Sequence, residues 1–235
     1  MVAAAGSGQR LGAGGPKAFV ELGGRALIEW SLAALDAARS IGAIVVAAPA
    51  GYEREAELAA GLAAPKAAVV VTPGGATRAA SIELALEHVR GDLVAVHDAA
   101  RPLITPGLVD RVVGRLAADP EADAAIAAAP LTDTVKRARS PRGGAGPGAE
   151  VIAETLDRDA LWAAQTPQVF RLAALRRAQR AAAAEDRLAA ATDEASLIEL
   201  AGGRVLLEET GSANFKVTTG ADLAAAEALV AVGSP

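Results

Sequence analysis

The chain has 235 residues, 52% of them hydrophobic, and its 23 basic and 28 acidic side chains give a formal net charge of −5. This length fits one domain or two small ones. A net acidic chain lacks the broad basic face that nucleic-acid or anionic-membrane binding requires. The absence of cysteine excludes disulfides and thiolate zinc sites, and two histidines argue against a multi-histidine metal cluster.

No apolar run approaches the roughly 20 residues of a membrane span. Residues 1–10 lack the basic and apolar regions of a secretory signal. We therefore expect a soluble, cytoplasmic protein with neither nucleic acid nor a membrane as a partner.

Short apolar runs alternate with longer amphipathic segments. The expected strands are 1–5, 41–48, 67–72, 93–97, 122–129 and 204–208. The expected helices, with apolar residues at helical spacing, are 25–38, 51–63, 76–90, 106–118, 171–184, 193–201 and 221–232. This order predicts an α/β fold with a doubly wound, mostly parallel, Rossmann-like sheet.

Residues 132–156 depart from this pattern. An alternating stretch at 132–138 and extended chain at 151–156 flank a segment rich in proline and glycine at 140–149. The pattern predicts two strands joined by a flexible loop and projecting from the main sheet. Because an isolated hairpin is only marginally stable, we expect it to pack against another surface, such as a second copy of the chain. A disordered surface insertion is the alternative.

The residues after the first strand are typical of a phosphate-binding loop. Gly6 and Gly8 let backbone N–H groups surround a phosphate chain, and Arg10 and Lys17 add positive charge. The loop does not match the dinucleotide-binding fingerprint, because Leu11 stands where its third glycine belongs. It does not match a P-loop either, which would need Gly-Lys-Ser/Thr around Lys17. A glycine-rich turn with surface charges is the alternative.

A second glycine pair, Gly74-Gly75, lies with Ser81 between a strand and a helix. Ligands bind at the carboxyl ends of strands in open α/β sheets, so this loop suggests contacts to a base or ribose. An ordinary turn with Thr77 as the helix N-cap is the alternative.

Asp98 follows a buried strand, where one carboxylate beside phosphate groups would suit Mg²⁺. A cap or turn aspartate is the alternative. Arg101 can hold a second phosphate by a bidentate contact, whereas His97 is expected to be a buried structural histidine.

Thr192, followed by two acidic residues, is typical of a helix N-cap. Lys216 lies in a β-like run, where a lone lysine is usually a solvated edge charge.

Together these segments resemble the 2-C-methyl-D-erythritol 4-phosphate cytidylyltransferase family. The matching pieces occur in one order from about residue 3 to residue 230, at 4–12 with Pro16-Lys17, Gly74-Gly75, 97–102, 133–136, 157–162, 166–168, 192–196 and 214–218. Two positions depart from the family pattern, with Ala76 where an acidic residue is common and Ala3 in place of a proline.

The resemblance implies one nucleotidyltransferase domain over 1–235, acting as a homodimer. It would join CTP to 2-C-methyl-D-erythritol 4-phosphate with Mg²⁺ or another divalent cation, releasing pyrophosphate. It assigns catalysis to Arg10, Lys17, Arg158 and Lys216. It assigns nucleotide binding to Ala4, Ala5, Gly6, Ser7, Gly8, Gln9, Gly75, Ser81, Asp98 and Ala99. Asp98 would also bind the metal. We assign Arg101, Thr134, Thr166 and Thr192 to the sugar phosphate, and the arm at 132–156 would carry Thr134 and Arg158 to the partner's site.

Three alternatives remain open. A ribitol 5-phosphate cytidylyltransferase is the nearest, although Ala99-Ala100 and the run at 166–169 favour the methylerythritol substrate. A sugar-1-phosphate nucleotidyltransferase usually needs a larger sugar-binding region. A non-catalytic nucleotide-binding module would not require all of the cationic positions to be present.

Overall fold

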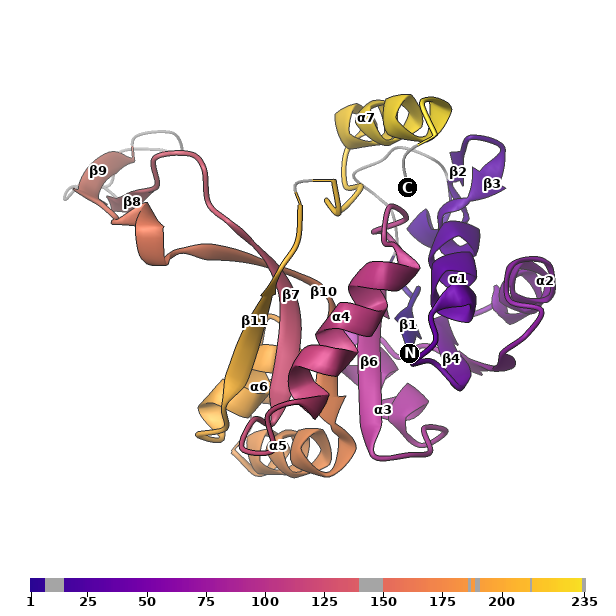
Figure 1. Ribbon diagram of the computed structural model, residues 1–235, viewed down its shortest axis with the longest axis horizontal. Coiled ribbons are helices and arrows are strands. Elements are labelled where there is room, and N and C mark those ends of the chain that lie inside the picture. Colours follow the sequence, from indigo (N-terminus) through magenta and orange to yellow (C-terminus); the bar gives the residue numbers. More distant parts are fainter. Residues whose placement is uncertain (7–14, 140–149, 186, 189–190, 212, 234–235) are drawn as a thin grey trace.

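The structure, a computed structural model, describes residues 1–6, 15–139, 150–185, 187–188, 191–211 and 213–233. Its main sheet has the strand order β11-β7-β10-β6-β1-β4-β5 (Figure 1). Strands β1, β4, β5 and β6 run parallel to one another, as do β7 and β11, whereas β10 is antiparallel to both of its neighbours. The bounds are β1 (Val2–Ala3), β4 (Ala43–Ala48), β5 (Ala68–Pro73), β6 (Leu93–Asp98), β7 (Ala124–Pro130), β10 (Trp162–Arg171) and β11 (Val205–Glu209).

Helices cover both faces of this sheet. One face packs against α3 (Arg78–Leu86), α5 (Leu172–Ala184) and α6 (Glu194–Leu200). The other packs against α1 (Leu27–Ala37), α2 (Glu53–Ala63) and α4 (Pro106–Ala117). The predicted doubly wound, mostly parallel sheet is therefore confirmed. None of the helices in the described ranges is long and apolar enough to cross a membrane.

A smaller apolar cluster lies beside the main sheet. The hairpin β2 (Glu21–Leu22) and β3 (Arg25–Ala26) packs through Leu22 against Ala226 of α7 (Gly220–Ala231). The first helix therefore begins at Leu27 rather than at the expected Arg25, because Arg25 and Ala26 pair with β2. Phe215 and Val217 join this cluster, which fixes the segment that carries Lys216. Lys216 itself lies in irregular chain and not in the β-like run that the sequence suggested.

Strand β10 was not among the predicted strands, although it lies in the middle of the sheet. Its sequence includes Gln165-Thr166-Pro167-Gln168, a polar run with a proline that is unfavourable in a central strand. The register against β7 shifts between Ala164 and Gln168, which accommodates the proline. The polar side chains are buried and find hydrogen-bond partners on neighbouring segments, so only the tertiary structure stabilises this strand.

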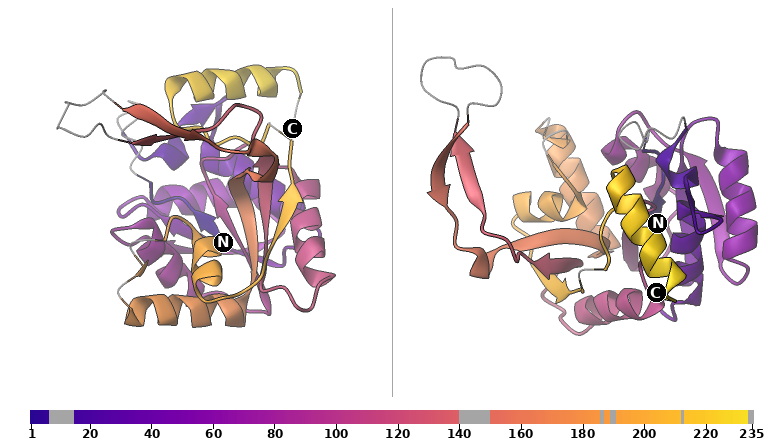
Figure 2. Two further views of the ribbon diagram at one scale, coloured as in Figure 1. Left: turned by 90° about the vertical axis from the view of Figure 1, so that its left-hand side faces the viewer. Right: turned by 90° about the horizontal axis from the view of Figure 1, so that it is seen from above.

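The arm is a separate antiparallel pair, β8 (Lys136–Arg139) and β9 (Val151–Thr155). All of its strand residues are exposed, and it projects away from the main sheet (Figure 2). The two strands pair as predicted, but β8 begins at Lys136 rather than at Thr132. The expected loop at 140–149 lies outside the described residues. A short 3-10 helix, η3 (Arg158–Ala160), connects the arm to β10.

Candidate functional site

A cavity of about 590 Å³ lies at the carboxyl ends of β1, β5 and β6. Parallel strands bring the loops that follow them to one edge of a sheet, which is where open α/β folds bind ligands. The lining residues come from five segments: Ala3 at the end of β1 with Ala4, Ala5 and Gly6 after it; Lys17 and Ala18 of η2 (Lys17–Phe19); Gly75, Ala76, Thr77, Arg78 and Ser81; Asp98, Ala99 and Ala100; and Lys216 and Thr218.

The glycine pair lets two of these loops touch. A Cβ on Gly74 would stand 2.6 Å from the Cβ of Ala5, and one on Gly75 would stand 2.5 Å from the Cβ of Ala80. Both distances are too short for a side chain, so glycine is required by close approach. The Gly75 N–H donates to Ser81 Oγ at 3.0 Å. The second glycine loop is therefore held against Ala5, at the end of the first strand.

Thr77 is the N-cap of α3, as the alternative interpretation of this loop predicted. Its hydroxyl accepts from the Ala80 N–H at 3.1 Å. Because Thr77 also lines the cavity, the ordinary turn and the ligand-facing loop are the same structure.

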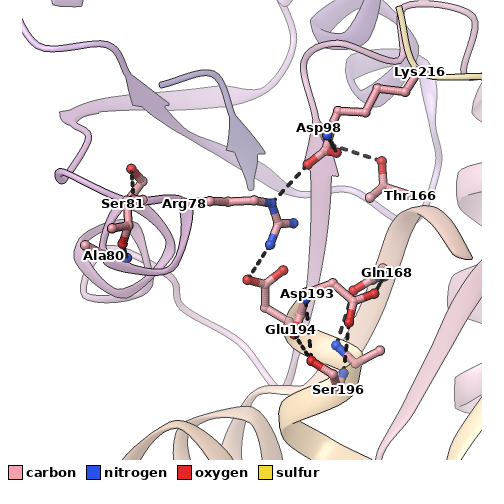
Figure 3. Close-up of polar contacts among 12 residues, drawn as sticks. Arg78, Ala80, Ser81, Asp98, Thr166, Gln168, Asp193, Glu194, Ser196 and Lys216 are labelled. Atoms are coloured by element: carbon pink, nitrogen blue, oxygen red, sulfur yellow. Dashed lines mark hydrogen bonds and ion pairs between the residues drawn. The ribbon is translucent and has the colours of Figure 1, made fainter. Parts of the chain in front are cut away.

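Asp98 lines the cavity. It forms ion pairs with two basic side chains (Figure 3). Its Oδ2 lies 2.7 Å from Lys216 Nζ, and its Oδ1 lies 3.3 Å from Arg78 Nε. Its backbone N–H donates to Thr166 Oγ1 at 3.1 Å. Burial alone would raise the pKa of Asp98, but Lys216 and Arg78 outweigh it and lower that pKa to about 2. The carboxylate is therefore ionised throughout the neutral range.

Arg78 continues this network away from the cavity. Its Nη1 donates to Glu194 Oε1 at 2.7 Å, and Glu194 is only 3% exposed (Figure 3). Burial raises the pKa of Glu194, and Arg78 opposes that rise. Burial would lower the pKa of Arg78, but the two carboxylates reverse this and raise it. Lys216, Asp98, Arg78 and Glu194 thus form a charge chain of two cations and two anions.

His97 is a buried structural residue, as predicted. Its Nε2 lies 3.2 Å from the carbonyl oxygen of Arg101, and its Nδ1 lies 3.0 Å from Thr166 Oγ1. A carbonyl oxygen only accepts, so Nε2 carries the proton and the Thr166 hydroxyl donates to Nδ1. Burial lowers the pKa of His97 to about 4, so the ring is neutral at physiological pH.

Arg101 connects β6 to the segment before Lys216. Its Nη1 donates to the Asn214 carbonyl at 2.8 Å and its Nη2 to the Ala164 carbonyl at 3.4 Å. The Val217 N–H donates to the Ala100 carbonyl at 2.8 Å. These bonds hold Lys216 over the end of β6, beside Asp98.

The structure brings most of the predicted nucleotide-binding residues together. The described members of that set line the cavity, with Lys17 and Lys216 of the catalytic set: Ala4, Ala5, Gly6, Gly75, Ser81, Asp98 and Ala99. Ser7, Gly8, Gln9 and Arg10 lie outside the described residues. Arg78 and Thr218 also line the cavity, although neither was among the predicted site residues. The signal for Arg78 was its position directly after the glycine loop, at the first residue of a helix.

The remaining predicted residues do not line this cavity in a single copy of the chain: Arg101, Thr134, Arg158, Thr166 and Thr192. Arg158 lies at the base of the arm and donates to the Thr132 carbonyl, and Thr134 is exposed on the arm. Thr192 is exposed and precedes α6, whose N-cap is Asp193. The expectation that Thr192 caps this helix was therefore wrong by one residue.

The oxygen atoms at the cavity fit a divalent cation that is bound partly by the protein and partly by the phosphate oxygens of a ligand. Asp98 is the one carboxylate among the described residues that line the cavity, and no group of three potential metal ligands occurs among the described residues. Mg²⁺ commonly binds one or two carboxylates together with phosphate oxygens and water. An ionised carboxylate has about four lone-pair positions, so the two cations already bound to Asp98 leave room for a metal.

Comparisons with known proteins agree across the chain. A family model described as 2-C-methyl-D-erythritol 4-phosphate cytidylyltransferase matches residues 1–232. A bifunctional enzyme IspD/IspF of Anaeromyxobacter sp. (strain Fw109-5) is 45% identical over 99% of this chain, which spans 58% of the length of that relative. A 2-C-methyl-D-erythritol 4-phosphate cytidylyltransferase of Ralstonia nicotianae is 41% identical, with 100% of this chain and 92% of that protein covered. The crystal structure of the 2-C-methyl-D-erythritol 4-phosphate cytidylyltransferase from Thermus thermophilus superimposes with a TM-score of 0.74 at 37% identity, covering 98% of this chain and 97% of that one.

Proposed function

Because the chain belongs to the 2-C-methyl-D-erythritol 4-phosphate cytidylyltransferase family, we propose that it transfers a cytidylyl group from CTP to 2-C-methyl-D-erythritol 4-phosphate. The observation that supports this most is the meeting of Lys17 and Lys216 at one cavity, which Asp98, Gly6 and Gly75 also line. Local positive charge on a net acidic protein suits the capture of a small polyanion such as a triphosphate.

The proposed reaction is an in-line displacement at the α-phosphorus of CTP. An oxygen of the substrate phosphate forms the new P–O bond while the bond to the β-phosphate oxygen breaks, and pyrophosphate leaves with that electron pair. Such a reaction needs alignment and charge neutralisation rather than a protein nucleophile. Lys17 and Lys216, together with Arg10, are the cations proposed to neutralise the developing charge.

The nucleotide is proposed to lie against the two glycine loops. Backbone groups at Ala5, Gly6 and Gly75 border the cavity, and the Ser81 hydroxyl donates to the Thr77 carbonyl at 2.8 Å. These contacts make the wall rigid and polar, as discrimination of a base edge requires. We propose the cytosine and ribose subsites here.

Asp98 is proposed to hold Mg²⁺. When bound, the metal would supply neutralisation of the phosphate charges. The low pKa of Asp98 keeps its carboxylate available for a cation at any pH at which the protein would work.

The sugar phosphate site is proposed to need a second copy of the chain. Thr134 and Arg158 lie on the arm and at its base, away from the cavity of their own chain. We propose a cytoplasmic homodimer in which each chain is one nucleotidyltransferase domain and each arm brings these residues to the partner's cavity. For Arg101, Thr166 and Thr192, binding of the sugar phosphate stays a prediction.

The test is a pyrophosphate-release assay with each of the four ribonucleoside triphosphates, paired with 2-C-methyl-D-erythritol 4-phosphate or ribitol 5-phosphate. We expect turnover only with CTP and the methylerythritol substrate, with the CDP-linked product identified by mass spectrometry. Equal or faster turnover of ribitol 5-phosphate would contradict the proposed substrate. CTP binding without pyrophosphate release would instead support a non-catalytic nucleotide-binding module.

A further inference from the structure

The charge chain contains one residue that the cavity does not touch. Glu194 lies behind Arg78 and is not among the residues that line the cavity. It is almost fully buried, and its Oε2 has no hydrogen-bond partner among the residues that the structure describes. A buried carboxylate of this kind is tolerated only because a cation pairs with it, so Glu194 and Arg78 depend on each other.

Arg78 faces the cavity and the buried carboxylate at once. Its side chain is 31% exposed, and its Nη2 hydrogen-bonds to none of the residues that the structure describes. Nε and Nη1 are used by Asp98 and Glu194, and the Nη1 contact is the shorter of the two. Arginine binds phosphates well, so an arginine that lines a triphosphate cavity would normally be expected to bind them. Here two carboxylates already balance and hold its charge.

We infer that Glu194 is a positioning residue that holds the Arg78 guanidinium back from the phosphates. This inference rests on the proposed function, because it presumes that phosphates occupy the cavity. With Glu194 in place, Arg78 orients Asp98 and contributes little to phosphate binding. Without the negative charge of Glu194, the guanidinium keeps its charge but loses one of its two counter-ions, so it turns to a phosphate in the cavity. Glu194 therefore limits how tightly the site holds substrate and product phosphates.

The test uses the variant Glu194→Gln in the full chain, with inorganic pyrophosphate titrated by calorimetry. Glutamine keeps the shape and an acceptor oxygen but removes the charge. We expect pyrophosphate to bind about tenfold more tightly than in the parent, because Arg78 gains one charge-assisted hydrogen bond to phosphate. The KM for CTP should fall with no rise in kcat, which a merely structural role for Glu194 would not cause.

The matched control is Glu199→Gln, which removes the same charge from an exposed position of the same helix and should leave the pyrophosphate affinity unchanged. The double variant Arg78→Met with Glu194→Gln removes both charges and should lack the tenfold gain of the single variant, because the guanidinium that would bind phosphate is gone. It also carries the test if the single variant fails to fold.

Two results would overturn the inference. One is a folded Glu194→Gln variant whose pyrophosphate affinity is within twofold of the parent. The other is a double variant that loses tenfold or more in affinity, because Arg78 would then bind phosphate directly in the parent. A parent protein that binds neither pyrophosphate nor CTP would contradict the proposed function itself, and this inference with it.

Discussion

Asp98 and its two cations give the cavity a fixed electrostatic centre. The ion pair with Lys216 joins the end of β6 to a segment more than 100 residues later in the chain. Backbone N–H groups of Thr219 and Thr218 lower the pKa of Asp222, near the start of α7, and the positive charge of Lys17 adds to this effect. Lys17 and Lys216 thus come from separate parts of the molecule and line one cavity together with Asp98.

The substitution Lys17→Met tests the catalytic role of this lysine. Methionine keeps an unbranched side chain and removes the charge, so kcat should fall about 100-fold while the protein stays folded. Steady-state kinetics and a thermal melt measure the two effects. Lys66→Met, an equivalent change in an exposed loop, should leave kcat unchanged. A Lys17→Met variant with near-parental kcat would contradict the assignment.

His97 contributes to the pH dependence of the stability of the protein. Burial lowers its folded-state pKa to about 4, below the ordinary value of 6.5, so the unfolded chain binds the proton more readily. The resulting stabilisation is complete above pH 6.5 and is lost as the pH falls from 6.5 to 4, by up to about 3 kcal/mol.

Urea unfolding of the parent at several pH values between 7 and 4 measures this loss. His97→Gln should flatten the dependence, whereas the same change at His88, which is exposed, should not. An unchanged pH profile in the His97 variant would show that another group governs the acid sensitivity.

At the scale of elements, β10 and α6 stabilise each other through polar contacts. Asp193 caps α6 by accepting from the Ser196 N–H at 3.0 Å, and its other oxygen accepts from Gln168 Nε2 at 2.7 Å. The Ala195 N–H donates to Gln168 Oε1 at 3.3 Å. The start of a short helix and the polar middle of a central strand therefore share one network, just behind Glu194.

Asp193→Ala should cost more than the loss of a helix cap. The cap contributes about 1 kcal/mol, and leaving the amide of Gln168 buried without its acceptor adds about 1–3 kcal/mol. Chemical denaturation measures the sum. Thr219→Ala removes a capping box of the same kind from α7 and should cost only about 1 kcal/mol. Equal losses in the two variants would mean that Gln168 does not depend on Asp193.

At the scale of the whole molecule, the arm is the part least explained by a single chain. Its strands contact each other, and Val151 and Ile152 expose apolar side chains. Two exposed strands bury too little apolar surface to be stable alone, which favours a second copy as the surface they pack against.

Ile152→Asp should therefore weaken self-association by about tenfold or more, because it places a charge in an apolar contact. Ile152 is 64% exposed in one chain, so its own fold should tolerate the change. Sedimentation velocity over a concentration series measures the dissociation constant. Leu62→Asp alters a still more exposed leucine on α2, at 78%, and should leave association unchanged. Loss of activity in parallel with dissociation would agree with Thr134 and Arg158 serving the partner.

Patterns along the chain were enough to predict most of the alternating strands and helices, the arm and the loops that line the cavity. These features follow from local rules, since apolar periodicity, glycine loops and helix caps are set by neighbours along the chain. The loop residues Gly75, Asp98 and Lys17 could be placed at one sheet edge because parallel strands carry their following loops to the same side.

Features that depend on partners far away in the sequence became visible only in the folded chain. The polar run of β10 forms a strand because His97, Asp193 and Asn214 satisfy it from other elements. Glu194 looks like an ordinary first-turn acid until Arg78, 116 residues earlier, is found beside it. Ion pairs and buried polar contacts between remote segments leave no periodic trace in a sequence, because their geometry exists only once the chain has folded.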